Sequence, residues 1–173
     1  MMRIEAATSS DLSDIKRLHT ESWRTAYAPF LPSAALDRLD AEMERRWTVL
    51  PADVEVARSD GEVLGFVRTK KRDGWAYIDN LHVHPDMRGR GIGQALFHAA
   101  GQRLAATGEG GVWLTVIAAN TAARRFYRAM GGFEGGLLTE PVLGCPTRTR
   151  PVIWRSLRRF ASANDRANAL DAG

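Results

Sequence analysis

Arg88-Gly89-Arg90-Gly91-Ile92-Gly93 forms a glycine-rich turn between a predicted strand, residues 75–83, and a predicted helix, residues 91–107. Its glycines permit positive φ and let the backbone approach a ligand closely. The helix that follows presents unpaired N–H groups and the positive end of its dipole to this turn. Arg88 and Arg90 add charge-assisted donors. The physical match for such a turn is an anion, above all a pyrophosphate.

Two widespread phosphate-binding motifs do not fit this turn. The dinucleotide fingerprint requires GxGxxG after the first strand, whereas Gly89, Gly91 and Gly93 give GxGxG after about four predicted strands. The P-loop requires a Gly-Lys-Ser/Thr ending, and Gly93 is followed by Gln94 and Ala95. The turn therefore belongs to neither of these nucleotide-binding classes.

Hydrophobic periodicity and turn residues predict the other elements. The order is strand, two helices, three strands, helix, strand, helix and two strands, which indicates a mixed α/β layered domain. Strands are predicted at 2–7, 54–58, 63–69, 75–83, 112–118, 133–140 and 149–157, and helices at 12–27, 33–50, 91–107 and 121–130.

Alternation along the strand at 75–83 assigns its side chains to two faces. One face is expected to carry Tyr77, Asp79, Leu81 and Val83, and the other Ile78, Asn80 and His82.

Composition sets the class of protein. The chain has 173 residues with 45% hydrophobic and 25% charged, and 24 Lys+Arg against 20 Asp+Glu give a net charge of +4. These fractions are typical of a globular chain and exclude a disordered or collagen-like one. We expect one domain over residues 1–160 and a frayed tail over 161–173. The single cysteine, Cys145, and the lack of a signal peptide or membrane span predict a cytoplasmic protein.

The sequence resembles the GNAT superfamily of acetyl-CoA-dependent N-acetyltransferases over about residues 2–157. The acyl-CoA signature of that family, Arg/Gln-x-x-Gly-x-Gly/Ala, matches Arg88, Gly91 and Gly93, and residues 78–85 look like its fourth strand. The resemblance implies a central mixed, mostly antiparallel sheet of about six to seven strands flanked by four helices. Its second cofactor motif matches Asn120, Ala123, Phe126, Tyr127 and Gly131.

The resemblance also implies how acetyl-CoA binds. The pyrophosphate is expected on backbone N–H groups of residues 88–93, and the pantetheine arm as an added strand between the strands at 75–83 and 112–118. The implied cofactor-binding residues are Leu81, His82, Val83, Arg88, Gly89, Arg90, Gly91, Ile92, Gly93, Asn120 and Tyr127.

The implied reaction is direct attack of a primary amine on the thioester in a ternary complex. A main-chain N–H near Val83 is expected to stabilise the oxyanion, and Tyr127 to donate a proton to the departing thiolate. Asp79 is the candidate base, directly or through water, although the commonest family position for that carboxylate is Tyr77 here. Glu21, on the first predicted helix, is the alternative base.

The acceptor is a small-molecule or peptide amine whose identity the sequence leaves open. Trp23 and Tyr27 either line its pocket or belong to the core. His82, His84 and Asp86 lie along one strand end without a companion cluster, so no metal is expected. The resemblance leaves a homodimer open.

Two other functions compete with catalysis. One is a pseudoenzyme of the same fold that binds acyl-CoA as a sensor or regulator. The other is a basic nucleic-acid-binding module, but the sequence lacks a helix-turn-helix or an aromatic and basic sheet signature. We therefore expect an enzyme that contacts neither nucleic acid nor a membrane.

Overall fold

One twisted sheet organises residues 1–160, the part of the chain that the computed structural model describes. The predicted frayed tail, residues 161–173, lies outside the described residues. The strand order is β1-β2-β3-β4-β5-β8-β6, with β7 also paired to β8, and every pair is antiparallel except β4 with β5. The strands are β1 (Arg3–Ala6), β2 (Val54–Ser59), β3 (Glu62–Arg72), β4 (Trp75–Val83), β5 (Val112–Ile117), β6 (Phe133–Glu134), β7 (Leu138–Val142) and β8 (Cys145–Trp154).

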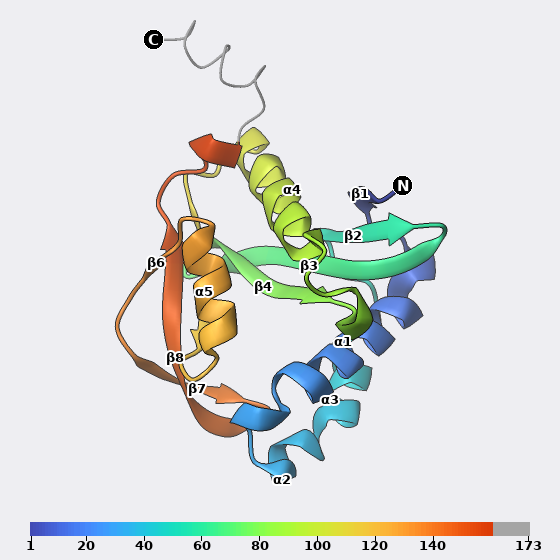
Figure 1. Ribbon diagram of the computed structural model, residues 1–173, viewed down its shortest axis with the longest axis vertical. Helices are drawn as coiled ribbons and strands as arrows, with labels where there is room; N and C mark the ends of the chain where they lie inside the picture. Colours follow the sequence, from blue (N-terminus) through green and yellow to red (C-terminus); the bar gives the residue numbers. More distant parts are fainter. Residues whose placement is uncertain (161–173) are drawn as a thin grey trace, which may run out of the picture.

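Helices cover both faces of the sheet, as Figure 1 shows. The helix α4 lies across one face, and α1 and α3 lie against the other. This arrangement confirms the predicted mixed α/β fold. The helices are α1 (Leu12–Ala26), α2 (Ser33–Leu36), α3 (Leu39–Arg46), α4 (Ile92–Ala106) and α5 (Thr121–Ala129).

Two hydrophobic clusters form the core, one on each face of the sheet. The cluster beneath α4 includes the fully buried Leu96 and Phe97. The cluster beneath α1 and α3 includes the fully buried Ile15, Leu39 and Phe66. Burying an aliphatic or aromatic side chain of this size stabilises a fold by about 1.5–3 kcal/mol. The sheet between these two layers is therefore a rigid support for the strand ends.

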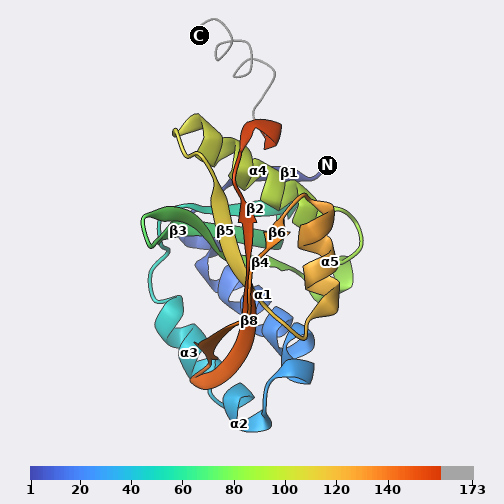
Figure 2. The same cartoon turned by 90° about the vertical axis from the view of Figure 1, so that its left-hand side faces the viewer.

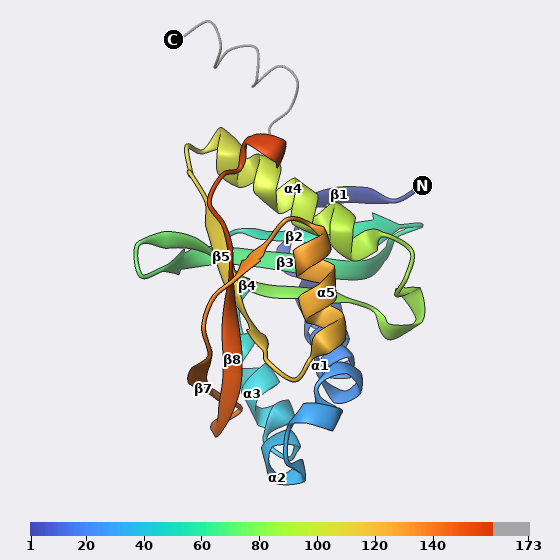
Figure 3. The same cartoon turned by 60° about the vertical axis from the view of Figure 1, so that its left-hand side comes forward.

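β4 and β5 separate soon after they meet. Their parallel pairing is confined to Ala76 with Val112 and Tyr77 with Trp113. From there β5 continues beside β8, steeply inclined to β2 and β3 (Figures 2 and 3). The edge of β4 that faces β5 therefore has no strand paired to it beyond Tyr77 among the residues described. This is the gap between strands that the family resemblance implied.

A bulge in β4 changes which side chains share a face. Arg68 pairs with Asn80 but the next residue, Thr69, pairs with Ile78, so Asp79 is an extra residue in β4. A bulge shifts the alternation of side chains by one position.

The predicted faces of β4 are consequently wrong in part. Ile78 lies in the core beneath α4, and Leu81 and Val83 pack against that same core. Asn80 accepts a hydrogen bond from Arg46 of α3. Asp79 therefore does not share a face with Leu81 and Val83, because the bulge stands between them.

Two predicted elements are divided in the structure. The predicted helix 33–50 is broken between α2 and α3, although Ala35 and Leu39 on either side of the break are both buried. The two predicted C-terminal strands are three, because Gly135 and Gly136 separate β6 from β7 and the turn at Leu143–Gly144, with positive φ at both residues, joins β7 to β8. The described sheet therefore has eight strands, one more than the upper expectation.

Candidate active site

The glycine-rich turn after β4 leaves the start of α4 open. Gly89 and Gly91 have φ of +76° and +79°, and a Cβ atom on either would meet nothing within 4 Å. Gly91 is the N-cap of α4 and, as a glycine, has no side chain to cap the first turn of that helix. The N–H groups of the first turn are thus available to an anion, and the helix dipole favours negative charge there.

A cavity of about 400 Å³ extends from this turn along the free end of β4, between α1 and α5. All the expected cofactor-binding residues line it except Arg90, which is exposed. Four further residues line it that the sequence did not predict as site residues: Ser22, Ala26, Met87 and Gln94. One continuous cavity therefore joins the two motifs that lie about thirty residues apart in the sequence.

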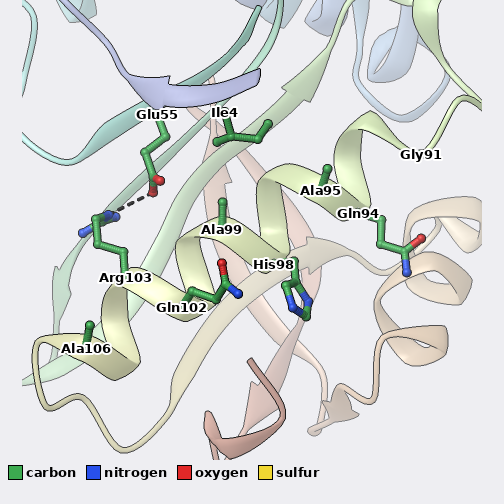
Figure 4. Close-up of a pocket in the computed structure, with 10 residues that line it drawn as sticks. All are labelled: Ile4, Glu55, Gly91, Gln94, Ala95, His98, Ala99, Gln102, Arg103 and Ala106. Atoms are coloured by element: carbon green, nitrogen blue, oxygen red, sulfur yellow. Dashed lines mark hydrogen bonds and ion pairs between the residues drawn. The ribbon is translucent and has the colours of Figure 1, made fainter. Parts of the chain in front are cut away.

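A larger hollow of about 800 Å³ lies elsewhere, on the outer side of α4 beside β1 (Figure 4). It is a shallow surface groove, crossed at one end by the ion pair of Arg103 with Glu55, whose Nε and Oε1 atoms are 2.9 Å apart. Of the residues expected in the site it includes Gly91 alone. Although this groove is larger, we assign the candidate site to the smaller cavity, because the motif residues line that one.

Asn120 and Phe126 place Tyr127 at the cavity wall. The Asn120 side chain caps α5, accepting a hydrogen bond from the N–H of Ala123 at 3.1 Å. Phe126 lies against Gly93, at which a Cβ atom would be 3.4 Å from the Phe126 ring. The cap and this contact fix α5 against the start of α4.

The Tyr127 phenol is partly buried and stays protonated. Its ring packs edge-on against Phe126 and Trp154, with ring centroids 5.3 and 6.0 Å apart. Burial raises the pKa of Tyr127 well above its usual value, with smaller contributions from Tyr27 and Tyr77. A phenol in this state is available as a hydrogen-bond or proton donor throughout the physiological pH range.

A hydrogen-bond chain links the turn, α1 and β4. The Arg88 guanidinium donates to Ser22 Oγ and to Thr25 Oγ1, both at 3.3 Å. Ser22 Oγ in turn is 2.9 Å from His82 Nδ1. Arg88, expected as a phosphate ligand, is thus also a tie between the turn and α1.

His82 is buried among aromatic rings and held neutral. Its ring centroid lies 4.5 Å from that of His19 and 5.6 Å from that of Phe66. Burial lowers the pKa of His82 to about 3, with further contributions from Arg88 and Arg46. His82 is therefore an uncharged part of the cavity wall at neutral pH.

Neither candidate base lines this cavity. Asp79 is paired with Lys70 at 2.9 Å and Arg68 at 3.3 Å. Burial alone would raise the pKa of Asp79, but these cations outweigh it and the pKa is lowered. Glu21 lies on the wall of a separate cavity, with His84 Nε2 3.3 Å from its carboxylate. These contacts make Asp79 a weaker proton acceptor than the sequence suggested.

Trp23 of α1 and Tyr27, the C-cap residue of that helix, have different positions. Tyr27 lines the cavity, whereas Trp23 packs against the core beneath α1 and α3. Their rings meet edge-on with centroids 4.5 Å apart. The sequence left open whether these residues line a pocket or belong to the core. Tyr27 lines the cavity, and Trp23 packs against the core beside it.

The comparisons with known proteins agree with this geometry. The model of the acetyltransferase (GNAT) family matches residues 13–132, so the chain belongs to this family of acyltransferases. An uncharacterized N-acetyltransferase of Methanocaldococcus jannaschii is 29% identical over 147 residues, 80% of this chain and 83% of that protein. A second, from Archaeoglobus fulgidus, is 34% identical over 73% of this chain and 89% of its own length.

Solved structures show the same fold. The ribosomal-protein-S18-alanine N-acetyltransferase of Escherichia coli aligns with a TM-score of 0.67 and 22% identity, over 94% of this chain and 96% of that one. PaiA N-acetyltransferase from Thermoplasma acidophilum, in complex with coenzyme A, aligns with a TM-score of 0.63 and 20% identity, over 87% and 98%.

Within residues 1–160 no group of three or more His, Cys, Asp or Glu side chains is arranged to hold a metal ion. The helices of the same part of the chain are too short or too polar to cross a bilayer.

Proposed function

We propose that the protein transfers the acetyl group of acetyl-CoA directly to a primary amine in a ternary complex, in the cytoplasm. The observation that carries the proposal is the single cavity that joins the open start of α4 to Tyr127 along the unpaired edge of β4. Family membership and neighbouring structures that contain coenzyme A or acetyl-CoA support it.

The residues present fit a coenzyme. The uncapped N–H groups at Gly91 and beyond, with the positive φ of Gly89 and Gly91, suit the pyrophosphate. The edge of β4 at Leu81 and Val83 offers main-chain groups to the amides of a pantetheine arm in the manner of an added strand. When bound, acetyl-CoA supplies the acetyl group as a reactive thioester.

The residues of the chain then have separate tasks. In this proposal a main-chain N–H near Val83 stabilises the negative charge that develops on the carbonyl oxygen. Tyr127 donates to the departing sulfur, because its phenol is protonated and lines the cavity. Tyr27 and His82 form the wall on the α1 side, where the acceptor enters.

Calorimetry and a thiol-release assay test the proposal together. Acetyl-CoA should bind with one site per chain, and at least one member of a broad panel of primary amines should release CoA thiol. Tight binding without turnover on any amine would instead indicate an acyl-CoA sensor of the same fold. Absence of binding at millimolar acetyl-CoA would contradict both functions.

A further inference from the structure

Within residues 1–160 no carboxylate lines the cavity that holds Tyr127. Among the described residues that line it, Arg88 is the only one that carries a charge and His82 is the only imidazole. An amine that arrives as an ammonium ion must lose a proton before its nitrogen can attack. The capacity of His82 to accept that proton therefore decides which amines the site can use.

The hydrogen bonds around Ser22 are compatible with one neutral tautomer of His82, which carries its hydrogen on Nε2. The Ser22 hydroxyl has two partners among the described residues, Arg88 Nη2 and His82 Nδ1. Because a guanidinium only donates, the hydroxyl accepts from Arg88 and keeps its own hydrogen for His82 Nδ1, if that nitrogen carries none. A neutral imidazole that accepts at Nδ1 carries its hydrogen on Nε2. In that tautomer Nδ1 accepts from Ser22 and Nε2 carries the hydrogen, so neither nitrogen has a free lone pair for an ammonium proton.

The surroundings of His82 also oppose its protonation. The cations that act on it are Arg88, from the turn after β4, and Arg46, from α3. The groups that face it from α1 and its C-cap are neutral: Ser22, the ring of His19 and the phenol of Tyr27, whose centroid is 6.2 Å away. Burial comes first among the causes that hold its pKa at about 3. An imidazole in this environment does not take a proton from an ammonium ion.

Neither nearby carboxylate replaces His82 as a proton acceptor. Asp79 lies at the bulge, outside the cavity lining, and forms ion pairs with Lys70 and Arg68. Glu21 faces the cavity on the other side of α1 with His84. The described lining of the cavity therefore offers no carboxylate that could take a proton from an ammonium ion.

Given the proposed acetyl transfer, we infer that the acceptor is an amine that is already largely neutral in solution, specifically the α-amino group of a peptide or amino-acid derivative. An α-amino group has a pKa of about 7.7–8.0 and a lysine side chain about 10.4. Near pH 7.5 about a third of the former is neutral but only about a thousandth of the latter.

Proton balance is simple for a neutral amine. Its nitrogen forms the C–N bond, the C–S bond breaks with the electron pair on sulfur, and nitrogen loses one proton while sulfur gains one. Tyr127 delivers the proton to sulfur and regains one from the newly formed amide through solvent. No additional base is needed. An ammonium ion must first lose its extra proton to solvent, because no described side chain that lines the cavity assists that step, so the neutral fraction in solution limits its reaction.

A peptide with one free α-amino group and one lysine tests this inference in a single reaction. Tandem mass spectrometry of the product should place the acetyl group on the α-nitrogen, with a preference of about a hundredfold or more, following the ratio of neutral fractions. Matched peptides blocked at one nitrogen or the other serve as controls. Equal or faster transfer to lysine would overturn the inference but leave the proposed function intact, whereas no transfer to any amine despite bound acetyl-CoA would contradict both.

The pH dependence provides an independent readout. For a series of amines of similar size, log kcat/KM should rise with pH and level off at the pKa of each amine, so the break moves with the substrate. A break that stays below pH 7 for every amine would reveal an enzyme base and overturn the inference. Imidazole nitrogen NMR, assigned with His82→Gln, should show His82 neutral and protonated at Nε2 at pH 6; protonation at Nδ1, or a doubly protonated ring, would also overturn it.

Discussion

Ser22 of α1 and His82 of β4 are joined by a 2.9 Å hydrogen bond between Oγ and Nδ1, although sixty residues separate them in the sequence. Both side chains are buried, with 2% and 8% of their surfaces exposed. Through Arg88 the same hydroxyl is tied to the glycine-rich turn. The helix α1, proposed to bound the acceptor side of the cavity, is therefore held in place against the turn proposed to bind the pyrophosphate.

Removal of the Ser22 hydroxyl should cost stability. Ser22→Ala leaves His82 Nδ1 and one Arg88 donor without this partner, and an unsatisfied buried polar group costs about 1–3 kcal/mol. Urea denaturation measures the change in the free energy of unfolding. Thr25→Ala is the matched control, because Thr25 also accepts from Arg88 but is exposed. This variant should lower the free energy of unfolding by about 0.5 kcal/mol or less. Equal effects would mean that the Ser22–His82 bond contributes nothing.

Replacement of the Tyr127 phenol should affect turnover and not coenzyme binding. Tyr127→Phe keeps the ring against Phe126 and Trp154 but removes the proton donor. We expect kcat to fall roughly ten- to a thousandfold, near or below the usual range for acid catalysis, with an unchanged Kd for acetyl-CoA.

The comparison variant for this measurement is Tyr27→Phe, on the opposite wall of the cavity. It should change the KM for the amine more than kcat, because Tyr27 is proposed to face the acceptor. A wild-type kcat in Tyr127→Phe would remove Tyr127 from the mechanism.

The glycine-rich turn and the order of elements could be predicted because both depend on local signals. Positive φ at Gly89 and Gly91, the helix that begins at Ile92 and the cap at Asn120 follow from short-range chemistry that a sequence displays. The gap between β4 and β5 followed from the family resemblance. These features account for most of the cavity lining.

The bulge at Asp79 could not be predicted, because the alternation of residues 75–83 contains no sign of an extra residue. A bulge is set by pairing with β3, at Arg68 and Thr69, which is a tertiary relationship. The prediction that Asp79 shares a face with Leu81 and Val83 failed for this reason. Ser22 was missed for a similar reason, since only the packing of α1 on β4 brings it to His82.

A side chain at Gly91 should abolish coenzyme binding. Gly91→Val places a β-branched residue at φ +79°, and the open space above it is where the pyrophosphate is proposed to lie. Left-handed backbone costs about 1–2 kcal/mol for a residue with a Cβ atom, so stability falls as well. We expect no detectable acetyl-CoA binding by calorimetry at concentrations that saturate the wild type.

Gly74→Val is the control that separates the loss of stability from the loss of acetyl-CoA binding expected for Gly91→Val. Gly74 lies in the turn between β3 and β4 with φ +80°, and a Cβ atom there also meets nothing within 4 Å. Its loss of stability should match that of Gly91→Val, while acetyl-CoA binding persists. Wild-type affinity in Gly91→Val would mean that the pyrophosphate binds elsewhere.

The buried histidines should make the protein less stable in mild acid. Burial lowers the pKa of His19 and of His82 below the 6.5 of an unfolded chain. Below pH 6.5 the unfolded chain therefore binds protons that the folded one does not, and the free energy of unfolding decreases as pH falls. For two such groups the decrease is about 2 kcal/mol between pH 6.5 and 5.5. Carboxylates with lowered pKa, such as Asp11, act only nearer pH 4.

Urea denaturation across this pH range, repeated on single variants, assigns the effect to the buried rings. His82→Gln should reduce the slope of unfolding free energy against pH by about half, because one of the two groups no longer titrates on unfolding. His98→Gln, at an exposed position on α4, should keep the wild-type slope. A wild-type slope in His82→Gln would show that His82 is protonated equally in the folded and unfolded states, and the neutral imidazole on which the choice of acceptor depends would then be absent.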